Sequence, residues 1–522
     1  MRRVLETGEM QALDRQASAC YGIPSLLLME NAGGECARAL CSAFPSLSGG
    51  VLVFAGRGNN GGDGFVIARR LFCRGIPVHT VLAGSSDEVR GDARTNLDIL
   101  RQMRAPLHEI GPGQDVGAVE QRIASADVVV DALLGTGTQG GARGIAAQLI
   151  DLINRSGKPV LSVDLPSGLC ADLPMPNGPA VRATLTVTFA FPKPCLVLPP
   201  AADHAGRVEV VDIGIPCRLA EASAPRLAVF EVGDARAAFP GRATAAHKGS
   251  FGHVLVVAGS PGKTGAAAMA GLAVLRAGGG LVTVAVPQGV HPVVSTKVTE
   301  AMTAPLPQTD DGCVGRAAQE VVERLAVGKR VVAIGPGLGT HPETRALVQH
   351  LVRTLPVAMV IDADALNALA GQVDSMAAAP AARILTPHPG ECARLLDLEM
   401  TDVLRDRVAI VRGTATRTGS ILVFKMAGTL VGDAQGLVTI NPTGNPGMAT
   451  GGAGDVLTGV IAGLLAQGAS PELAARAGTF VHGAAGDLAA ARLGETGLIA
   501  GDILDAIPSA IDSVVGTGHG YA

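Results

Sequence analysis

The chain has 522 residues, and 42 Lys and Arg against 46 Asp and Glu give it a formal net charge of −4. Its aromatic residues are 11 Phe, 2 Tyr and no Trp. A near-neutral chain with so few aromatic rings lacks the basic surface and the stacking platforms of a nucleic-acid-binding protein. Glycine is abundant instead, with 69 residues, which is typical of α/β layers joined by many tight strand-to-helix turns.

Residues 1–9 carry acidic side chains where a signal peptide would have an apolar segment, and no apolar run approaches the ~18 residues of a membrane span. The 9 cysteines never form Cys-x-x-Cys, which excludes the common zinc and thioredoxin-like patterns. We therefore expect a reduced cytoplasmic protein that binds neither membranes nor nucleic acids.

Short Val, Leu and Ile runs closed by Gly, Asp or Pro predict buried strands that alternate with helices. The predicted strands are 51–55, 78–82, 128–130, 160–163, 185–189, 208–211, 254–257, 281–286, 331–334, 357–361, 383–385 and 421–424, and the predicted helices include 11–19, 25–43, 65–74, 145–154, 266–276 and 455–466. The alternation predicts an α/β fold whose N-terminal domain is a Rossmann-like, doubly wound, mostly parallel sheet. The pattern lapses over 218–246, so we expect two domains, 1–222 and 223–522.

The first predicted strand leads into residues 56–64, which read GRGNNGGDG. Three of these glycines match G-x-G-x-x-G before a helix, a pattern typical of dinucleotide binding. Backbone N–H groups at a helix start suit a phosphate, whereas Asn and Asp oxygens suit a ribose or a hard cation. The second strand ends in Leu-Ala-Gly at 82–84, without an acidic residue for a ribose, which disfavours an ordinary NAD-dependent oxidoreductase.

Two further strands of the first half end in a carboxylate, Asp131 before Ala-Leu-Leu-Gly-Thr-Gly and Asp164 before Leu-Pro-Ser-Gly. Ligands of doubly wound sheets bind beyond the carboxyl ends of the strands. A single Asp at a strand end is more often a helix cap or a turn former. Three of them, each beside Gly, Ser or Thr, favour a site, so we expect Asp63, Asp131 and Asp164 to converge on one crevice.

The strongest motif of the second half is NPGMATGGAGD at 445–455, which opens an apolar helix. Its glycine-rich turn offers free N–H groups and a positive helix dipole to an anion, and Asp455 beside that anion could take a hydroxyl proton. Residues 259–264 suggest a P-loop, but Val257 stands where the first glycine should be, which excludes a Walker A motif. His388 and Lys425 also lie near strand ends, where they could equally be a structural histidine and a solvated lysine.

Together these segments resemble the bifunctional NAD(P)H-hydrate repair enzymes, in which an NAD(P)HX epimerase is fused to an ADP-dependent NAD(P)HX dehydratase. Segments 59–64, 131–137 and 164–168 resemble the epimerase, and segments 247–249, 259–260, 335–339, 362–367, 386–391 and 445–455 resemble the dehydratase. The resemblance implies a ribokinase-like α/β fold for the second domain. The chain departs from the family at Met426, where we expect a glycine of Lys-Gly-Ala-Gly-Thr, and at Cys195, where glycine is usual.

The resemblance implies an isomerase and a lyase acting in turn. The first half would interconvert the R and S epimers of NAD(P)HX, the hydrated forms of NADH and NADPH. The second half would dehydrate (6S)-NAD(P)HX with ADP, releasing NAD(P)H, AMP and phosphate. The implied cofactors are K⁺ in the epimerase half and Mg²⁺ with ADP in the dehydratase half, and we expect a homo-oligomer.

The resemblance also implies roles for individual residues. Asp164 and Asp455 would be catalytic. The hydrated dinucleotide would contact Asn59, Asn60, Gly61, Gly62, Asp63, Gly135, Thr136, Gly137, Thr138, Gln139, Gly140, Gly141, Asp164, Ala267, Gly337, His388 and Asp455. ADP would contact Lys425, Met426, Ala427, Gly428, Thr429 and Gly454, and the potassium ligands would be Asn60, Asp131 and Ser167.

Three other functions fit parts of the sequence. A kinase for a small alcohol would leave a stable phosphorylated product. A nucleotide-sensing module without turnover would have no use for Asp164 and Asp455. A dinucleotide-dependent oxidoreductase is the third alternative, and the preference between NADHX and NADPHX stays open.

Overall fold

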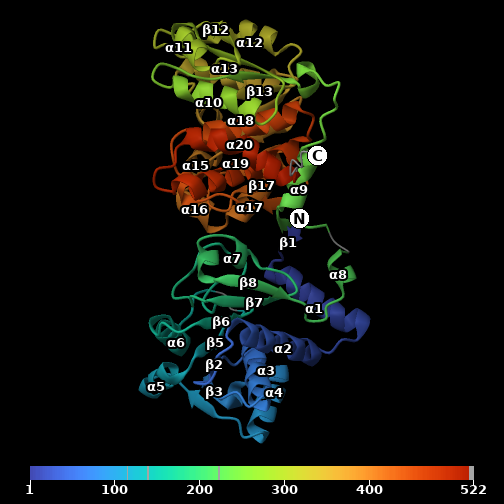
Figure 1. Cartoon of the computed structure of the whole chain (residues 1–522), viewed down its shortest axis with the longest axis vertical. Helices are drawn as coiled ribbons and strands as arrows, with labels where there is room; N and C mark the ends of the chain where they lie inside the picture. Colours follow the sequence, from blue (N-terminus) through green and yellow to red (C-terminus); the bar gives the residue numbers. More distant parts are fainter. Residues whose placement is uncertain (115, 138–139, 222–223, 517–522) are drawn as a thin grey trace, which may run out of the picture. The chain divides into compact units, whose positions relative to one another are not determined.

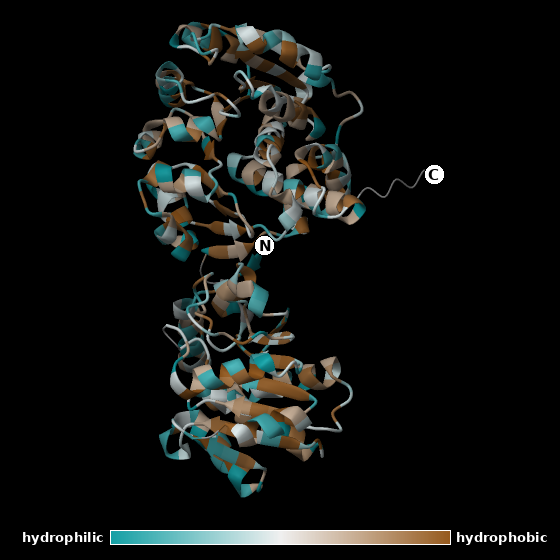
Figure 2. Ribbon diagram, turned by 90° about the vertical axis from the view of Figure 1, so that its left-hand side faces the viewer, coloured by the Kyte–Doolittle hydropathy of each residue, from teal (hydrophilic) through white to brown (hydrophobic). Residues whose placement is uncertain are grey.

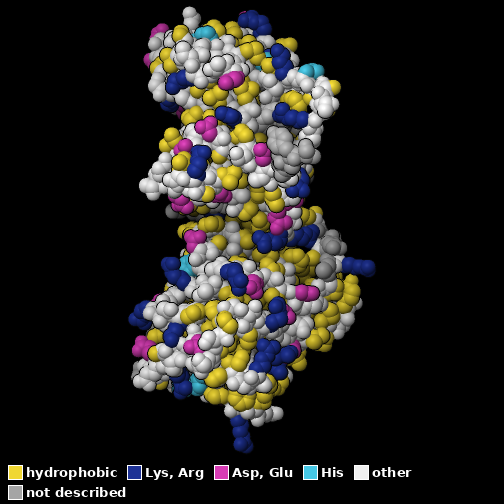
Figure 3. Space-filling view, in the orientation of Figure 1, with side chains coloured by type: hydrophobic (Ala, Val, Ile, Leu, Met, Phe, Trp, Pro, Cys, Tyr) yellow, Lys and Arg dark blue, Asp and Glu magenta, His cyan; other side chains and the backbone are white. Residues whose placement is uncertain are grey.

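The computed structural model describes residues 1–114, 116–137, 140–221 and 224–516. The chain forms two compact units, one of Arg3–Pro225 and one of Arg226–Ala522 together with Met1–Arg2 (Figure 1). The predicted boundary at 222/223 falls outside the described residues. Within each unit, basic and acidic side chains are interspersed over the visible face (Figure 3).

The N-terminal unit is built on a seven-stranded sheet with the order β4-β3-β2-β5-β6-β7-β8. All of its strand pairs are parallel, which confirms the predicted doubly wound sheet. The strands are β2 Val51–Ala55, β3 Val78–Ala83, β4 Leu107–Ile110, β5 Val128–Ala132, β6 Val160–Val163, β7 Leu185–Phe189 and β8 Arg207–Val211. The strand order reverses between β2 and β5, and such a switch point is where doubly wound sheets bind ligands.

Helices cover both faces of this sheet. They are α1 Thr7–Tyr21, α2 Ser25–Ala43, α3 Asn59–Cys73, α4 Gly91–Gln102, α5 Gly117–Ser125, α6 Gly144–Arg155, α7 Pro194–Val197 and α8 Cys217–Glu221. Alternate residues of β2 belong to two cores. Val51 and Val53 pack with α1 to α4, whereas Leu52 and Phe54 pack with α5 and α6. Figure 2 shows the resulting apolar strands between the helices.

The C-terminal unit has an eleven-stranded sheet with the order β1-β9-β18-β17-β16-β15-β14-β13-β10-β11-β12. Its strands are β1 Arg2–Arg3, β9 Leu227–Val229, β10 His253–Val257, β11 Leu281–Pro287, β12 Met302–Leu306, β13 Val331–Ile334, β14 Ala358–Ile361, β15 Arg383–Leu385, β16 Ile421–Phe424, β17 Leu430–Gly432 and β18 Val438–Ile440. The pairs from β12 through β16 are parallel, and β17 pairs antiparallel with both of its neighbours. This mixed sheet agrees with the predicted ribokinase-like α/β class.

The helices of this unit are α9 Val232–Ala235, α10 Thr264–Arg276, α11 His291–Lys297, α12 Gln319–Ala326, α13 Pro342–Thr354, α14 Asp364–Ala368, α15 Pro389–Leu396, α16 Met400–Arg405, α17 Arg407–Thr418, α18 Ala453–Ala466, α19 Pro471–Leu493 and α20 Ala500–Val515. Every residue of α18 from Val456 to Ala466 is buried, as expected for a helix that is apolar all round. A Cβ at Gly459 would lie 2.3 Å from the carbonyl oxygen of Ala270, so glycine is what lets α18 approach α10 this closely. The fully packed body of α18 fixes where its N-terminus points. Among the described helices, we find no candidate for a membrane span.

A buried arginine ties β15 to the neighbouring segments. Arg383 is 2% exposed. Its guanidinium donates hydrogen bonds to the carbonyls of Val352 (2.8 Å) and Leu355 (2.7 Å) at the end of α13, and to three further backbone carbonyls. These carbonyls have lost their contact with water, so the guanidinium compensates for the cost of burying them.

We predict that Arg383→Leu destabilises the C-terminal unit by about 3 kcal/mol or more, because each buried acceptor left without a donor costs about 1–3 kcal/mol. Urea denaturation of the full-length protein measures this loss. Arg353→Leu is the matched control, since Arg353 is exposed on α13 and its one acceptor within the described part of the chain is the carbonyl of Gln349. Equal effects of the two substitutions would contradict the role assigned to Arg383.

Candidate active sites

The glycine-rich loop after β2 folds back onto the strand that precedes it. A Cβ at Gly61 would lie 1.9 Å from the carbonyl oxygen of Gly56, so only glycine fits there. Helix α3 begins at Asn59, and the buried Asp63 follows one turn later. The predicted segment 59–63 therefore forms the first turn of a helix at the switch point of the sheet, with its N–H groups directed toward the carboxyl edge.

Asp131 and Ser167 form one buried network. Asp131 is completely buried at the end of β5. Its carboxylate accepts hydrogen bonds from the hydroxyl of Ser167 (2.5 Å), the amide of Ser167 (2.8 Å) and the hydroxyl of Ser162 (2.8 Å). No Lys or Arg of the described residues forms an ion pair with it. Burial raises the pKa of Asp131, although these hydrogen bonds oppose the change.

The three predicted potassium ligands meet at the turn after β5. Asn60 donates to the carbonyl oxygen of Leu134 (3.0 Å), and the hydroxyl of Ser167 lies 3.2 Å from the same oxygen. Gly135 follows directly, and a Cβ there would lie 3.0 Å from the Cβ of Asn60. The structure therefore brings Asn60 and Ser167 together at one backbone carbonyl, and Ser167 in turn is hydrogen-bonded to Asp131.

Asp164 forms a buried ion pair with a lysine. It follows β6 with φ +65°, a left-handed conformation that is uncommon for a residue with a side chain. Its carboxylate accepts from the Nζ of Lys193 at 2.5 Å and from the hydroxyl of Thr188 at 3.1 Å. Lys193 is 1% exposed. A strained carboxylate held by a buried ammonium is typical of a functional site.

A second carboxyl group lies within electrostatic reach of this pair. Burial, followed by the charge of Asp164, raises the pKa of Asp63 well above its usual value, and Lys193 offsets only part of the rise. Asp63 therefore favours its neutral form, while Asp164 is paired with an ammonium. A neutral carboxyl beside an ion-paired carboxylate supplies both a proton donor and a proton acceptor.

The predicted dinucleotide loop at 135–141 is described in part. Thr136 is partly exposed and Gly137 is exposed, both beside the crevice at the end of β5. Gly140 and Gly141 lead into α6. Thr138 and Gln139, which were also predicted to contact the dinucleotide, lie outside the described residues.

In the C-terminal unit, three predicted residues and Asp362, to which the sequence assigned no role, follow four neighbouring strands. Gly337 lies after β13, Asp362 directly after β14, His388 after β15 and Lys425 directly after β16. These strands are parallel and adjacent, so their carboxyl ends share one edge of the sheet. Helix α18 begins close to this edge, because a Cβ at Gly454 would lie 3.3 Å from the Nζ of Lys425.

A charged network forms at this edge around Asp362, which is 1% exposed. The Nζ of Lys425 donates to its Oδ1 at 2.6 Å, as does the hydroxyl of Thr386 at 2.7 Å, and the hydroxyl of Thr458 on α18 donates to its Oδ2 at 2.9 Å. Glu391 lies 3.7 Å from the same ammonium. Burial lowers the pKa of Lys425, but Asp362 and Glu391 outweigh burial, so the pKa lies above its usual value and the ammonium stays charged.

Asp455 lies in the first turn of α18, and its pKa bears directly on proton transfer. Burial and the charge of Asp362 raise its pKa to about 7, and Lys425 offsets only part of the increase. Lys425, the cation of this network, therefore pairs with Asp362, and Asp455 has no ion-pair partner among the described residues. A carboxylate whose pKa lies near neutrality is well suited to accept a proton from a bound hydroxyl.

The segment predicted to hold ADP, Lys425 to Thr429, is a turn between β16 and β17. The hydroxyl of Thr429 donates to the carbonyl of Met426 at 2.8 Å, and Gly428 has φ +66°. Met426 does not adopt a positive φ, so the expected glycine is not required by the backbone. Its sulfur instead accepts a hydrogen bond from Arg407.

The three remaining predicted contacts differ in accessibility. Gly337 lies against Ala266 and Lys263, and its carbonyl accepts from the hydroxyl of Ser260 at 2.8 Å. The side chain of His388 is half-exposed, and its Nδ1 caps α15. Ala267 lies on α10 and is completely buried.

Two site residues received no role from the sequence. Asp362 lies in segment 362–367, which resembles the dehydratase, and Lys193 lies two residues before Cys195. Asp362 directly follows a buried strand, as Asp164 does, and Asp131 lies at the end of one, so the same rule could have found it. Lys193 carries no such signal, because only the fold brings it to Asp164 from 29 residues away.

Comparison with known proteins connects both units to one kind of enzyme. The family described as "YjeF-related protein N-terminus" matches residues 25–195, and the family described as "NAD(P)H-hydrate dehydratase" matches residues 254–509. The chain is 45% identical to the bifunctional NAD(P)H-hydrate repair enzyme Nnr of Moorella thermoacetica, over 97% of this chain and 96% of that protein. It is 40% identical to the enzyme of the same name from Salinibacter ruber, over 99% and 97%.

Among solved structures, the chain resembles the ADP/ATP-dependent NAD(P)H-hydrate dehydratase of Bacillus subtilis, which was co-crystallized with ATP and Mg²⁺. The identity is 29% and the TM-score is 0.48. The alignment covers 56% of this chain and 100% of that chain.

We predict that Asp455→Asn stabilises the protein, and increasingly so as the pH rises. An unfolded Asp has a pKa of ~3.9, whereas the folded-state pKa of Asp455 is about 7. The folded state therefore binds the proton more tightly, and ionisation destabilises it progressively between these two values. The variant's gain in free energy of unfolding over wild type should be small near pH 4 and reach on the order of 2–4 kcal/mol above pH 7. Melting curves of wild type and variant across this range measure it, and a gain independent of pH would contradict the raised pKa.

Proposed function

The chain belongs to the bifunctional NAD(P)H-hydrate repair enzymes, and on that premise we propose that it repairs hydrated NADH and NADPH in two steps. The N-terminal domain, residues 1–222, epimerises R- and S-NAD(P)HX. The C-terminal domain, residues 223–522, dehydrates the S epimer with ADP. The observation that carries the second activity is Asp455, with a pKa of about 7 in the first turn of a buried helix.

For the epimerase, we assign to Asp164 the acid–base role in the interconversion of the two configurations at the hydrated ring carbon. Lys193 holds its carboxylate in place from within the core. Asp63 lies close enough for the charge of Asp164 to raise its pKa, and its neutral carboxyl can donate a hydrogen bond to the same substrate. The first turn of α3 and the loop at 135–141 would hold the dinucleotide at the switch point of the sheet.

For the dehydratase, the chemistry must convert a poor leaving group into a good one. Transfer of the terminal phosphoryl group of ADP to the ring hydroxyl leaves AMP and a phosphate ester, and Asp455 accepts the hydroxyl proton. The electron pair of the ring nitrogen then expels phosphate, and loss of a proton from the neighbouring ring carbon restores NAD(P)H. The free N–H groups at the start of α18 would stabilise the phosphoryl group during transfer.

Mg²⁺ would accompany the nucleotide and neutralise phosphate charge. Among the described residues, no three His, Cys, Asp or Glu side chains gather in a group that could hold a metal ion. The ion would then be bound mainly through nucleotide phosphates and water, as is common for Mg²⁺. Lys425 and the segment 426–429 would then contact the nucleotide itself.

We predict that single substitutions separate the two activities on a mixture of epimers with ADP. Wild type should convert both epimers to NAD(P)H. Asp164→Asn should consume only the S epimer and leave the R epimer, whereas Asp455→Asn should dehydrate neither but still interconvert them. General acid–base groups contribute about 10²–10⁴-fold, so each loss should be at least ~100-fold. Chromatography of the epimers and absorbance of the dihydronicotinamide measure both reactions.

Exposed carboxylates provide matched controls for these variants. Asp151 on α6 and Asp512 on α20 are both exposed, and Asp151→Asn and Asp512→Asn should leave both reactions unchanged. Normal dehydration by Asp455→Asn would refute the assignment of the base. A stable phosphorylated product with wild type would indicate a kinase in place of a dehydratase.

We also propose K⁺ for the network at Asp131. Its donors are carboxylate, hydroxyl, amide and carbonyl oxygens, the ligand chemistry of a hard cation. A fully buried carboxylate without a Lys or Arg partner among the described residues also favours a bound cation. When bound, the ion would supply fixed positive charge beside the dinucleotide site.

We predict that epimerisation rises when K⁺ is added to a buffer that contains only tetramethylammonium. Asp131→Asn, which removes the charge at nearly constant shape, should lose at least ~10-fold in rate and show no response to K⁺. Ser162→Ala is the control, because it removes a hydrogen bond to Asp131 but none of the proposed ligands. A K⁺ response that persists in Asp131→Asn would contradict this site.

The expected cytoplasmic location and the expected homo-oligomer complete the proposal. Both rest on the sequence and on the resemblance to the family. Light scattering of the purified protein tests the oligomer directly, and a mass equal to that of one chain would refute it.

A further inference from the structure

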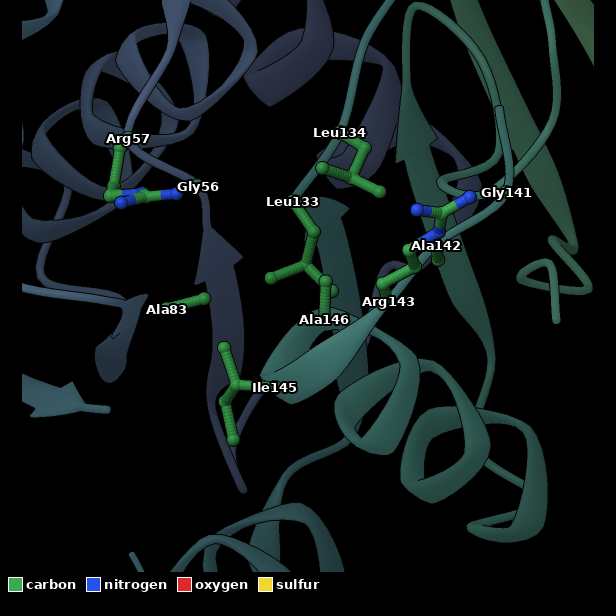
Figure 4. A pocket seen from close by; sticks show the side chains of 10 residues that line it. All are labelled: Gly56, Arg57, Ala83, Leu133, Leu134, Gly141, Ala142, Arg143, Ile145 and Ala146. Atoms are coloured by element: carbon green, nitrogen blue, oxygen red, sulfur yellow. The ribbon is translucent and has the colours of Figure 1, made fainter. Parts of the chain in front are cut away.

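A cavity of about 190 Å³ opens at the switch point of the N-terminal sheet. Its walls come from the ends of β2, β3 and β5 and from the start of α6 (Figure 4). It is smaller than the ~300–1,000 Å³ pockets that enclose whole ligands. It can therefore take one part of a dinucleotide, while the remainder lies along the predicted segments 59–63 and 135–137.

Arg57 lies where β3 ends. A Cβ at Gly84 would lie 2.8 Å from the Cδ of Arg57, so this side chain lies against the backbone directly after β3. One of its N–H groups donates to the carboxylate of Glu88 at 2.8 Å. The side chain is 55% exposed. An arginine has five N–H donors, so Arg57 can still bind an anion that enters the cavity.

A second arginine lies across the cavity. Arg143 is the N-cap residue of α6, and no described carboxylate forms an ion pair with it. Glu88 is thus the one carboxylate that contacts either guanidinium within the described residues. Leu133 supplies apolar surface between the two arginines, and Ala83 and Ile145 extend it below them (Figure 4). Apolar walls with two cationic groups match an adenosine that carries phosphates.

The position of Arg57 indicates which phosphate it binds. In doubly wound dinucleotide folds, the adenosine ribose lies at the end of the second strand. An acidic residue there binds the ribose hydroxyls, whereas an arginine accommodates a 2′-phosphate. Here β3 ends in Ala83 and Gly84 without an acidic residue, and Arg57 covers that position.

We propose that this cavity receives the adenosine end of the hydrated dinucleotide and that Arg57 binds the 2′-phosphate, so that the epimerase half prefers NADPHX to NADHX. Glu88 shares the guanidinium and orients it through its hydrogen bond, while its other oxygen accepts from the amide of Ser85 at 3.2 Å. The inference rests on the proposed epimerase function and adds a substrate preference to it.

The test is the KM for epimerisation of each substrate by the full-length protein. Arg57→Gln should raise the KM for NADPHX at least tenfold and change that for NADHX less than twofold, because hydrogen bonds to charged groups are this strong. Arg182→Gln, at an exposed arginine that does not line the cavity, is the matched control and should change neither. Equal effects of Arg57→Gln on both substrates, or no effect on either, would overturn the proposal.

Two further measurements separate the alternatives. Adenosine 2′,5′-bisphosphate should inhibit wild-type epimerisation at least tenfold more strongly than AMP does. Arg57→Gln should abolish that difference. Equal inhibition of the wild type by the two compounds would overturn the proposal. Glu88→Gln should leave the KM for NADHX unchanged, and a rise would mean that Glu88 binds the ribose hydroxyls instead. If wild type epimerises neither substrate, the proposed function itself fails, whereas equal use of both by wild type overturns only the preference.

Discussion

A carboxylate buried at the end of a strand must be compensated, and both units of this protein are organised around that constraint. The cost of burying a charge is several kcal/mol unless a cation or several donors offset it. Asp164 is offset by Lys193, and Asp362 by Lys425 together with two hydroxyl groups. In each unit the ammonium comes from a later part of the chain, so the site exists only when the sheet is complete.

The same compensation determines which groups can exchange protons. Each lysine neutralises one carboxylate and leaves a neighbour without a cation of its own. In the first unit that neighbour is Asp63, and in the second it is Asp455. Their raised pKa values follow from burial and from the compensated carboxylate nearby. In the second unit the compensated Asp362 is structural and its neighbour Asp455 is the proposed base, whereas in the first unit the compensated Asp164 is itself the proposed acid–base group and the neutral Asp63 assists it.

The sequence predicts much of this arrangement, because glycine-rich turns and strand-end carboxylates are local signals. Every strand it predicts is present, and Asn60, Asp131 and Ser167 do meet. It does not predict β4 and β12, which are partly polar or exposed strands at the edges of their sheets. It also does not predict β1, which has two residues, or β9, β17 and β18, which have three each. The sequence also fails to predict Lys193 and the pairing of Lys425 with Asp362, since an ion pair between distant segments leaves no pattern in either segment.

The pH dependence of dehydration by the wild-type protein tests the central claim most directly, namely that Lys425 neutralises Asp362 and leaves Asp455 as a base with a pKa of about 7. The measurement is kcat/KM for (6S)-NAD(P)HX at saturating ADP between pH 5 and 9. The account predicts a constant value above pH 7 and a tenfold fall for each pH unit below it, because only the ionised carboxylate accepts the proton. A profile that stays flat down to pH 5 would contradict it.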